Sequence, residues 1–168
     1  MLRKAAAWLL LIGLVALWAF NDRLFPPETL TAPSADVRDG DSFIIGRQTV
    51  RLHGIDAPEY RQMCKDARGA DWPCGRAARA QLEALILPGT VRCEIIARDQ
   101  YARAVARCSS AGTADLGAAM VAAGLAISPA ERGTATYKHE EESAREARRG
   151  IWQGEFLTPA AWRAANGR

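Results

Sequence analysis

Residues 37–59 read VRDGDSFIIGRQTVRLHGIDAPE, and this stretch decides the fold. Residues 37–39 and 42–45 are predicted strand segments, and residues 49–55 alternate as a half-buried strand does. The Gly46-Arg47 pair between them predicts a tight turn, because glycine accepts the backbone angles that such turns need. The segment is therefore expected to fold as a β-hairpin.

This hairpin is expected to bring two aspartates together. Asp41 lies where the first strand starts, and Asp56 follows the end of the second strand. Because the turn folds one strand back on the other, both carboxylates can face one cavity. Two aspartates with a backbone carbonyl and water form a hard-oxygen site suited to a large cation such as calcium. Asp39 is expected to cap the turn.

Three charged residues near these aspartates suit phosphoryl chemistry. Glu59 follows Asp56 by three positions, where it can orient or deprotonate a water molecule. Arg51 projects from the second strand and Arg103 opens a later one, and two guanidinium groups can clamp the oxygens of a phosphodiester. His53 shares the strand parity of Arg51 and is an alternative base. Each residue alone is commonly structural, so the hypothesis depends on the whole set.

The rest of the chain predicts a small barrel with about three helices. Two hairpins with interspersed helices suggest a partly closed, five-stranded barrel of the oligonucleotide/oligosaccharide-binding (OB) type, preceded by an N-terminal hydrophobic helix. The expected elements are a surface loop over 56–73, helices over 74–86, 115–124 and 135–149, a hairpin of 91–98 with 103–109, and a short strand over 125–127.

The four cysteines predict disulfides. Cys64, Cys74, Cys93 and Cys108 contain no C-x-x-C motif, and with only two histidines in the chain a zinc cluster is disfavoured. Three pairings are possible. A turn centred between residues 100 and 101 sets Cys93 opposite Cys108, which leaves Cys64 to pair with Cys74. Disulfides indicate an oxidising compartment.

The N-terminus predicts export. Residues 5–20 are uncharged and mostly apolar and follow Arg3 and Lys4, as in a signal peptide or signal anchor. We expect a signal segment over 1–23, a Pro-rich linker over 24–35, the folded domain over 36–155 and a C-terminal tail over 156–168. The domain is expected outside the cytoplasm, periplasmic or extracellular, anchored to the membrane or secreted if the segment is cleaved.

The composition excludes a wholly disordered chain and a polytopic membrane protein, and the net charge disfavours strong non-specific binding to nucleic acid. In 168 residues, 24% are charged and 7% aromatic, unlike a wholly disordered chain or a polytopic membrane protein. The net charge is +3, and beyond residue 26 there are 19 basic against 18 acidic residues. This balance does not support strong, histone-like non-specific binding to nucleic acid, because the affinity of such binding scales with the number of phosphates neutralised. Contacts with a polyanion must be local.

Six segments together resemble the thermonuclease, or staphylococcal nuclease-like, family over about residues 36–155. The resemblance implies an OB-type five-stranded barrel with three helices. It also implies a calcium-dependent phosphodiesterase that cuts DNA and RNA with little sequence preference and leaves 3′-phosphate ends. The segments are VRDGDSF (37–43), VRLHGIDAPE (50–59), CGRAAR (74–79), RDQYAR (98–103), DLGAAMVAAGLA (115–126) and AREARRGIW (144–152).

The same resemblance implies roles for individual residues. Asp41 and Asp56 match the calcium-binding carboxylates, and Ala57 stands where a backbone oxygen completes the set. The residues that match the catalytic positions are Arg51, Glu59 and Arg103. Glu59 would activate or position the attacking water, while the two arginines would hold the phosphate.

Two departures from the family pattern concern the substrate side. Ala102 replaces the glycine before the second arginine, which would strain the turn if it needs a positive φ. The tyrosines that stack on the nucleotide base have no counterpart in residues 127–130.

The alternative hypothesis is a non-catalytic, membrane-tethered OB-fold module that binds nucleic acid or another partner. No protein partner is predicted, and a monomer is expected.

Overall fold

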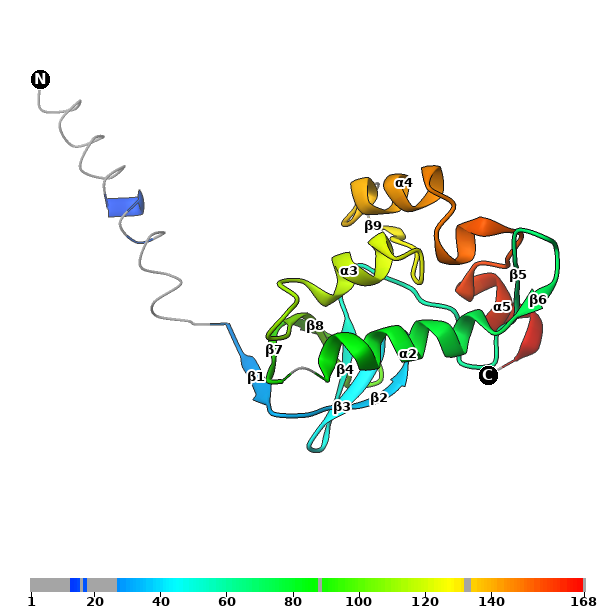
Figure 1. Cartoon of the computed structure of the whole chain (residues 1–168). Coiled ribbons are helices and arrows are strands. Elements are labelled where there is room, and N and C mark those ends of the chain that lie inside the picture. Colours follow the sequence, from blue (N-terminus) through cyan, green and yellow to red (C-terminus); the bar gives the residue numbers. More distant parts are fainter. Residues whose placement is uncertain (1–12, 16, 18–26, 88, 132–133, 168) are drawn as a thin grey trace, which may run out of the picture.

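The structure is a computed structural model that describes residues 13–15, 17, 27–87, 89–131 and 134–167. Its centre is a curled mixed sheet with helices packed against it (Figure 1). In the described part of the chain this sheet has six strands, in the order β1-β7-β8-β4-β3-β2. The strands are β1 (Thr29–Ala32), β2 (Asp36–Asp39), β3 (Ser42–Ile45), β4 (Gln48–Leu52), β7 (Val91–Arg98) and β8 (Ala104–Ser109).

The predicted hairpins are both confirmed. β3 pairs with β4 in antiparallel register, and β7 pairs with β8, while β4 and β8 run parallel to each other. Register shifts in the β2–β3 and β7–β8 pairs mark irregularities of the kind that bend strands, and β1 comes close to β3, so the sheet curls into a half-barrel. The OB-type architecture expected from the sequence is therefore correct.

Three segments have a secondary structure that differs from the prediction. Residues 29–32, inside the expected linker, form β1 and pair with β7, so the sheet has one strand more than expected. Edge pairing needs only free backbone groups, which an apolar count does not reveal. Residues 125–127 form no strand but a single bridge between Ile127 and Asp56. The expected 56–73 loop contains the two-residue strands β5 (Cys64–Lys65) and β6 (Asp71–Trp72).

The helices cover one side of the sheet and its open end. α2 matches its predicted bounds, α3 begins after its cap Asp115, and α4 is shorter than expected at both ends. The C-terminal tail folds back and ends in α5 beside β5 and β6 (Figure 1). The helices are α2 (Cys74–Ile86), α3 (Leu116–Ala122), α4 (Lys138–Glu146) and α5 (Pro159–Asn166), with a 3-10 turn η1 (Gly150–Gln153).

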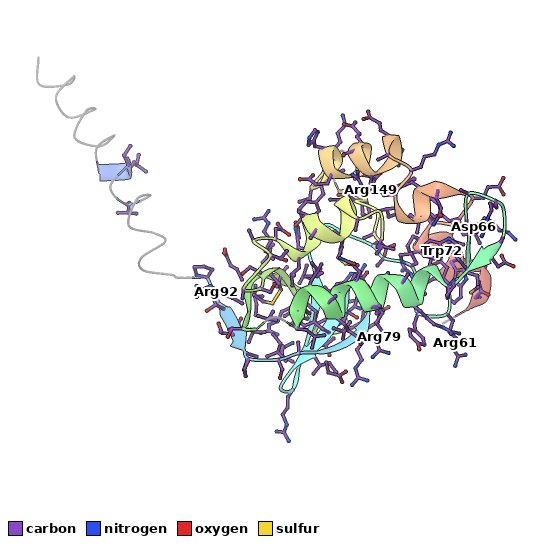
Figure 2. All side chains as sticks on the ribbon, in the orientation of Figure 1. Arg61, Asp66, Trp72, Arg79, Arg92 and Arg149 are labelled. Atoms are coloured by element: carbon purple, nitrogen blue, oxygen red, sulfur yellow. A yellow bond between two sulfur atoms is a disulfide. The ribbon has the colours of Figure 1, made fainter. Side chains whose placement is uncertain are left out.

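Two hydrophobic clusters hold these elements together. The larger, here called the barrel core, buries side chains of the sheet against α2 and α3, including Phe43, Leu52, Leu82 and Met120. The smaller, here called the tail cluster, surrounds a disulfide and joins the 56–73 loop to the tail. Its members are Cys64, Cys74, Ile151, Trp72, Ile127, Trp152 and Phe156. Figure 2 shows Trp72 at the end of the molecule where α5 lies.

Both predicted disulfides are present. Cys64 is bonded to Cys74, and Cys93 is bonded to Cys108 across the β7–β8 pair, where the two residues are direct partners. The hairpin register therefore identified the correct pairing among the three possibilities.

Most of the predicted signal segment lies outside the described residues. Residues 13–15 and 17 are helical. No helix built from described residues reaches the length and apolar character needed to cross a bilayer.

Candidate active site

A cavity of about 980 Å³ opens at the end of the half-barrel. Its wall is built by the β3–β4 hairpin, the loop that follows β4, the β7–β8 turn and α5. All five predicted functional side chains line it: Asp41, Arg51, Asp56, Glu59 and Arg103. The structure therefore brings these five residues around one cavity.

Hairpin register brings Asp41 and Asp56 to one guanidinium group. Ser42 pairs with Arg51, and the amide of Leu52 donates to the Asp41 carbonyl at 2.9 Å, so Asp41 lies beside the C-terminal end of β4. Arg51 Nη1 lies 2.8 Å from Asp41 Oδ2, and Arg51 Nη2 lies 2.9 Å from Asp56 Oδ1. The two carboxylates thus face each other across Arg51, as the hairpin argument required.

Backbone contacts fix both aspartates. Asp39 Oδ1 accepts hydrogen bonds from the Asp41 amide at 3.3 Å and from the Ser42 hydroxyl at 2.7 Å, which is the capping role predicted for it. Asp56 exchanges two backbone hydrogen bonds with Ile127, at 2.9 and 3.0 Å. The Ala57 amide donates to Asp41 Oδ2 at 3.3 Å, so the predicted carbonyl ligand residue is directly beside the carboxylates.

The Asp41 and Asp56 carboxyl groups are both buried and both contact arginine. Asp41 and Asp56 are only 4% and 5% exposed. Burial raises the pKa of the Asp41 carboxyl to about 8 despite the attraction of Arg51, and the neighbouring Asp39 and Asp56 act in the same direction as burial. Carboxylate oxygens are ligands of the kind that calcium takes, and here Arg51 contacts both carboxylates while Arg163 contacts Asp56 as well.

The cation site, if occupied, would use main-chain oxygen. No group of three or more His, Cys, Asp or Glu side chains suited to a metal ion occurs among the residues that the structure describes. The ligands that the sequence predicts are Asp41, Asp56 and the Ala57 carbonyl, with water filling the other positions.

Glu59 is held by a tight loop between the sheet and α2. Its carbonyl accepts from the Gln62 amide at 2.7 Å, and its own amide donates to Gln62 Oε1 at 3.2 Å. Gly75 of α2 packs against the same carbonyl so closely that an added Cβ would lie 1.8 Å from it. The absence of a side chain at Gly75 thus allows the loop to present Glu59 to the cavity.

Arg103 reaches the cavity from a different wall. Its Nε donates to Asp99 Oδ2 at 2.7 Å, and its amide donates to Asp99 Oδ1 at 3.0 Å. Partial burial opposes the ionisation of Asp99, but these hydrogen bonds outweigh it and lower the pKa of that carboxyl. Ala102, which precedes Arg103, has φ +60°, so the strain expected of alanine at this turn is present.

The alternative base His53 does not line the cavity. Its Nδ1 is buried without a hydrogen-bond partner, whereas Glu59 opens into the cavity. Strand parity alone suggested His53, but β4 ends at Leu52 and the chain turns away at Gly54, with φ +74°. The geometry favours Glu59.

Arg163 of α5 is a site residue that sequence reasoning missed. Its Nη1 lies 2.8 Å from Glu59 Oε1 and 3.1 Å from Asp56 Oδ1, and its Nη2 lies 3.1 Å from Asp56 Oδ2. The hydrogen bonds that Arg163 donates to Asp56 and Glu59 raise the pKa of its guanidinium group. The only sequence signal was a Trp-Arg pair in a helix capped by Thr158, 104 positions beyond Glu59.

Comparisons with known proteins agree with this geometry. The sequence model of the staphylococcal nuclease homologue family matches residues 49–154, a range that includes Arg51, Asp56, Glu59 and Arg103. A protein named succinoglycan biosynthesis protein ExoI, from Rhizobium meliloti, is 34% identical over 72% of this chain and 64% of its own length.

Two fungal proteins are also similar, both named probable endonuclease LCL3. The one from Schizophyllum commune is 35% identical over 68% of this chain and 44% of its own length. The one from Leptosphaeria maculans is 35% identical over 61% and 37%. The chain thus spans less than two thirds of the curated relatives it matches. The curled sheet, the residues gathered at its open end and the family match together show that this chain belongs to the staphylococcal nuclease homologue family.

Proposed function

We propose that this chain is a calcium-dependent nuclease that hydrolyses phosphodiester bonds of DNA or RNA with little sequence specificity. The observation that carries the proposal is the convergence of Asp41, Arg51, Asp56, Glu59 and Arg103 on one cavity. Membership of the family and the endonuclease names of two relatives support it. The domain has nearly equal numbers of basic and acidic residues, which suits an enzyme that releases its nucleic-acid product better than a protein that binds nucleic acid tightly.

In the proposed hydrolysis, side chains of this chain move the proton and stabilise the developing charge. Glu59 accepts a proton from a water molecule, whose oxygen forms a bond to phosphorus while the bond from phosphorus to the 5′ oxygen breaks. Arg51 and Arg103 donate hydrogen bonds to the phosphoryl oxygens, where negative charge grows in the transition state. The leaving oxygen takes up a proton from a solvent water molecule, and the hydroxide so formed accepts the proton from Glu59, which gives a 5′-hydroxyl and a 3′-phosphate and restores the base.

Calcium would be held by Asp41, Asp56 and the Ala57 carbonyl. When bound, it supplies a Lewis acid that polarises the phosphoryl group and neutralises charge on the two buried carboxylates. Arg51 already contacts both of these carboxylates and so holds them ready in one place.

Export with membrane anchoring is part of the proposal. The two disulfides suit an oxidising compartment, and the sequence before residue 27 has the pattern of a signal segment. Reaction of the domain with a membrane-impermeant label on intact cells, which a cytoplasmic domain would escape, tests this part.

The nuclease proposal is tested on the full chain, purified with its disulfides oxidised. Plasmid DNA and RNA are incubated with the protein in calcium or in a calcium chelator, beside Glu59→Gln. We expect calcium-dependent cleavage that falls by about 100-fold or more in the variant, as for loss of a general base. Nucleic acid that stays intact but is retained by the protein on a filter would support the non-catalytic binding module instead.

A further inference from the structure

α5 is joined to the rest of the protein by very few interactions. Of its eight residues only Pro159, in the first turn, is buried. Within the described residues, every hydrogen bond and ion pair between α5 and another part of the chain is made by the Arg163 side chain. Trp162 is partly buried but belongs to neither the barrel core nor the tail cluster. The position of this helix therefore depends mainly on one side chain.

The tail is anchored immediately before α5, so the helix has a fixed point about which it can move. Gln62, which is fully buried, donates from Nε2 to the Leu157 carbonyl at 2.7 Å. Phe156 packs edge-on against Trp152 in the tail cluster, with the two ring centroids 5.0 Å apart. Loss of the Arg163 contacts would thus free α5 without disturbing the residues that precede it.

Arg163 binds the oxygen atoms that the proposed reaction needs. Its Nη1 and Nη2 donate to Asp56 Oδ1 and Oδ2, each at 3.1 Å, and Nη1 also donates to Glu59 Oε1 at 2.8 Å. Asp56 is a predicted calcium ligand, and Glu59 is the proposed base. The guanidinium group thus occupies both oxygens of the first carboxylate and one oxygen of the second. With α5 in this position, the cation ligand and the base are already paired with each other's counterion.

A calcium ion and Arg163 compete for Asp56. Calcium takes carboxylate oxygens at about 2.3–2.6 Å, and here the guanidinium group already donates to both of the Asp56 oxygens. The two cations also repel each other, and because the Asp56 side chain is only 7% exposed, little water is present to screen that repulsion. By thermodynamic linkage, calcium weakens the contact of Arg163 with Asp56 by the same factor as Arg163 weakens the binding of calcium.

We infer that α5 is an autoinhibitory latch, which Arg163 closes in the calcium-free protein and calcium binding releases. This inference rests on the proposed nuclease function and adds its regulation, because the ion that the reaction needs also frees Glu59 from Arg163. An isolated helix of this length is unstable in water, so α5 unfolds when it is released. The calcium concentration at which cleavage begins is therefore set by Arg163 as well as by the calcium ligands.

Calcium binding by the full chain is measured by isothermal titration calorimetry, without nucleic acid. Arg163→Ala tightens calcium binding about tenfold, because the ion no longer has to displace a cation. Arg163→Lys, which keeps the charge but not the two-pronged hydrogen bonding, tightens it less. Arg47 provides the matched control: it is exposed at the β3–β4 turn and does not line the cavity, so Arg47→Ala changes calcium affinity less than about twofold. Circular dichroism melting shows that each variant is folded.

Hydrogen–deuterium exchange reports on the helix itself. In the wild type, the amides of residues 162–166 exchange about tenfold faster or more in calcium than in a calcium chelator, while the amides of α2 do not change. In Arg163→Ala the same amides exchange fast under both conditions, because the latch is already open.

Cleavage assays give a third, independent measurement. The calcium concentration for half-maximal cleavage falls about tenfold in Arg163→Ala, while the rate at saturating calcium stays within about twofold of the wild type. A rate that falls strongly at saturating calcium would show that Arg163 serves the reaction, and the latch would be wrong.

The failure of the latch and the failure of the nuclease proposal can be told apart. Unchanged calcium affinity in folded Arg163→Ala, or α5 amides that are equally protected with and without calcium, overturns the latch even if the wild type cleaves. Tighter calcium binding by Arg163→Ala and a calcium-released α5, in a protein that cuts no nucleic acid, support the latch and refute the nuclease. Absence of calcium binding by both proteins refutes the latch, and cleavage in a chelator then decides on nuclease activity separately.

Discussion

The barrel core and the tail cluster hold two different parts of one site. The barrel core fixes Asp41 and Arg51, whose positions follow from strand register and are shared by the whole sheet. The tail cluster lies under the 56–73 loop and the returning tail, close to Glu59 and α5. The position of Asp41 thus depends on the stability of the whole sheet, whereas the positions of Glu59 and α5 depend on the stability of the tail cluster.

The barrel core and the tail cluster also differ in size and in what their disulfides join. The barrel core is large and continuous, and its disulfide joins neighbouring strands that already pair with each other. The tail cluster has three fully buried members, and two of them are the cysteines of one disulfide. A small core of this kind gains relatively more from a covalent bond, because little apolar surface is available to stabilise it.

Phe43→Ala is the largest expected perturbation, because it removes a fully buried ring from the barrel core. The free energy of unfolding should fall by about 3–5 kcal/mol in denaturant titrations. Leu87→Ala, at a side chain that is 80% exposed, is the control and should cost less than about 0.5 kcal/mol. A similar small loss in both variants would show that the sheet and not the tail is the loosely packed region.

Removing the Cys64–Cys74 disulfide tests the tail cluster. The double variant Cys64→Ser, Cys74→Ser opens a loop with a sequence separation of 10, and its free energy of unfolding should fall by about 2–3 kcal/mol. Limited proteolysis should then cut near α5 while the barrel stays resistant, and cleavage of nucleic acid should fall in parallel. Loss of Cys93–Cys108 costs a similar amount, but should leave the tail resistant to protease.

The same division explains what the sequence could predict. Strand register follows from a period of two and a turn, so the approach of Asp41 to Asp56 and the Cys93–Cys108 pair could be predicted from local pattern, whereas the ion pairs of Arg51 with both aspartates were not predicted. Arg163 could not, because its contact with Glu59 spans 104 positions and depends on how the tail packs over Trp72 and Trp152. Strand β1 was missed for a related reason: its partner β7 is distant in sequence, and its alternation of polar and apolar residues covers only four positions.

Ala102→Gly sharpens the comparison between the two turns of the barrel. Ala102 has φ +60° and Gly46 has the same angle, so one turn carries the strain that the other avoids. Ala102→Gly should raise the free energy of unfolding by about 1 kcal/mol, and Gly46→Ala, with no atom within 4 Å of the new Cβ, should lower it by a similar amount. Equal melting temperatures for all three proteins would refute the strain argument.

Asp99→Asn is expected to have the smallest effect, and its sign depends on pH. The pKa of Asp99 is lower in the folded chain than in the unfolded chain, so the ionised carboxylate favours folding. This contribution is complete above the unfolded pKa of about 3.9 and disappears as the pH falls through the folded value. Wild type and Asp99→Asn should therefore differ in free energy of unfolding at neutral pH and converge in acid. A difference that stays constant from neutral to acid pH would mean that Asp99 holds the Arg103 turn through its shape and not through its charge.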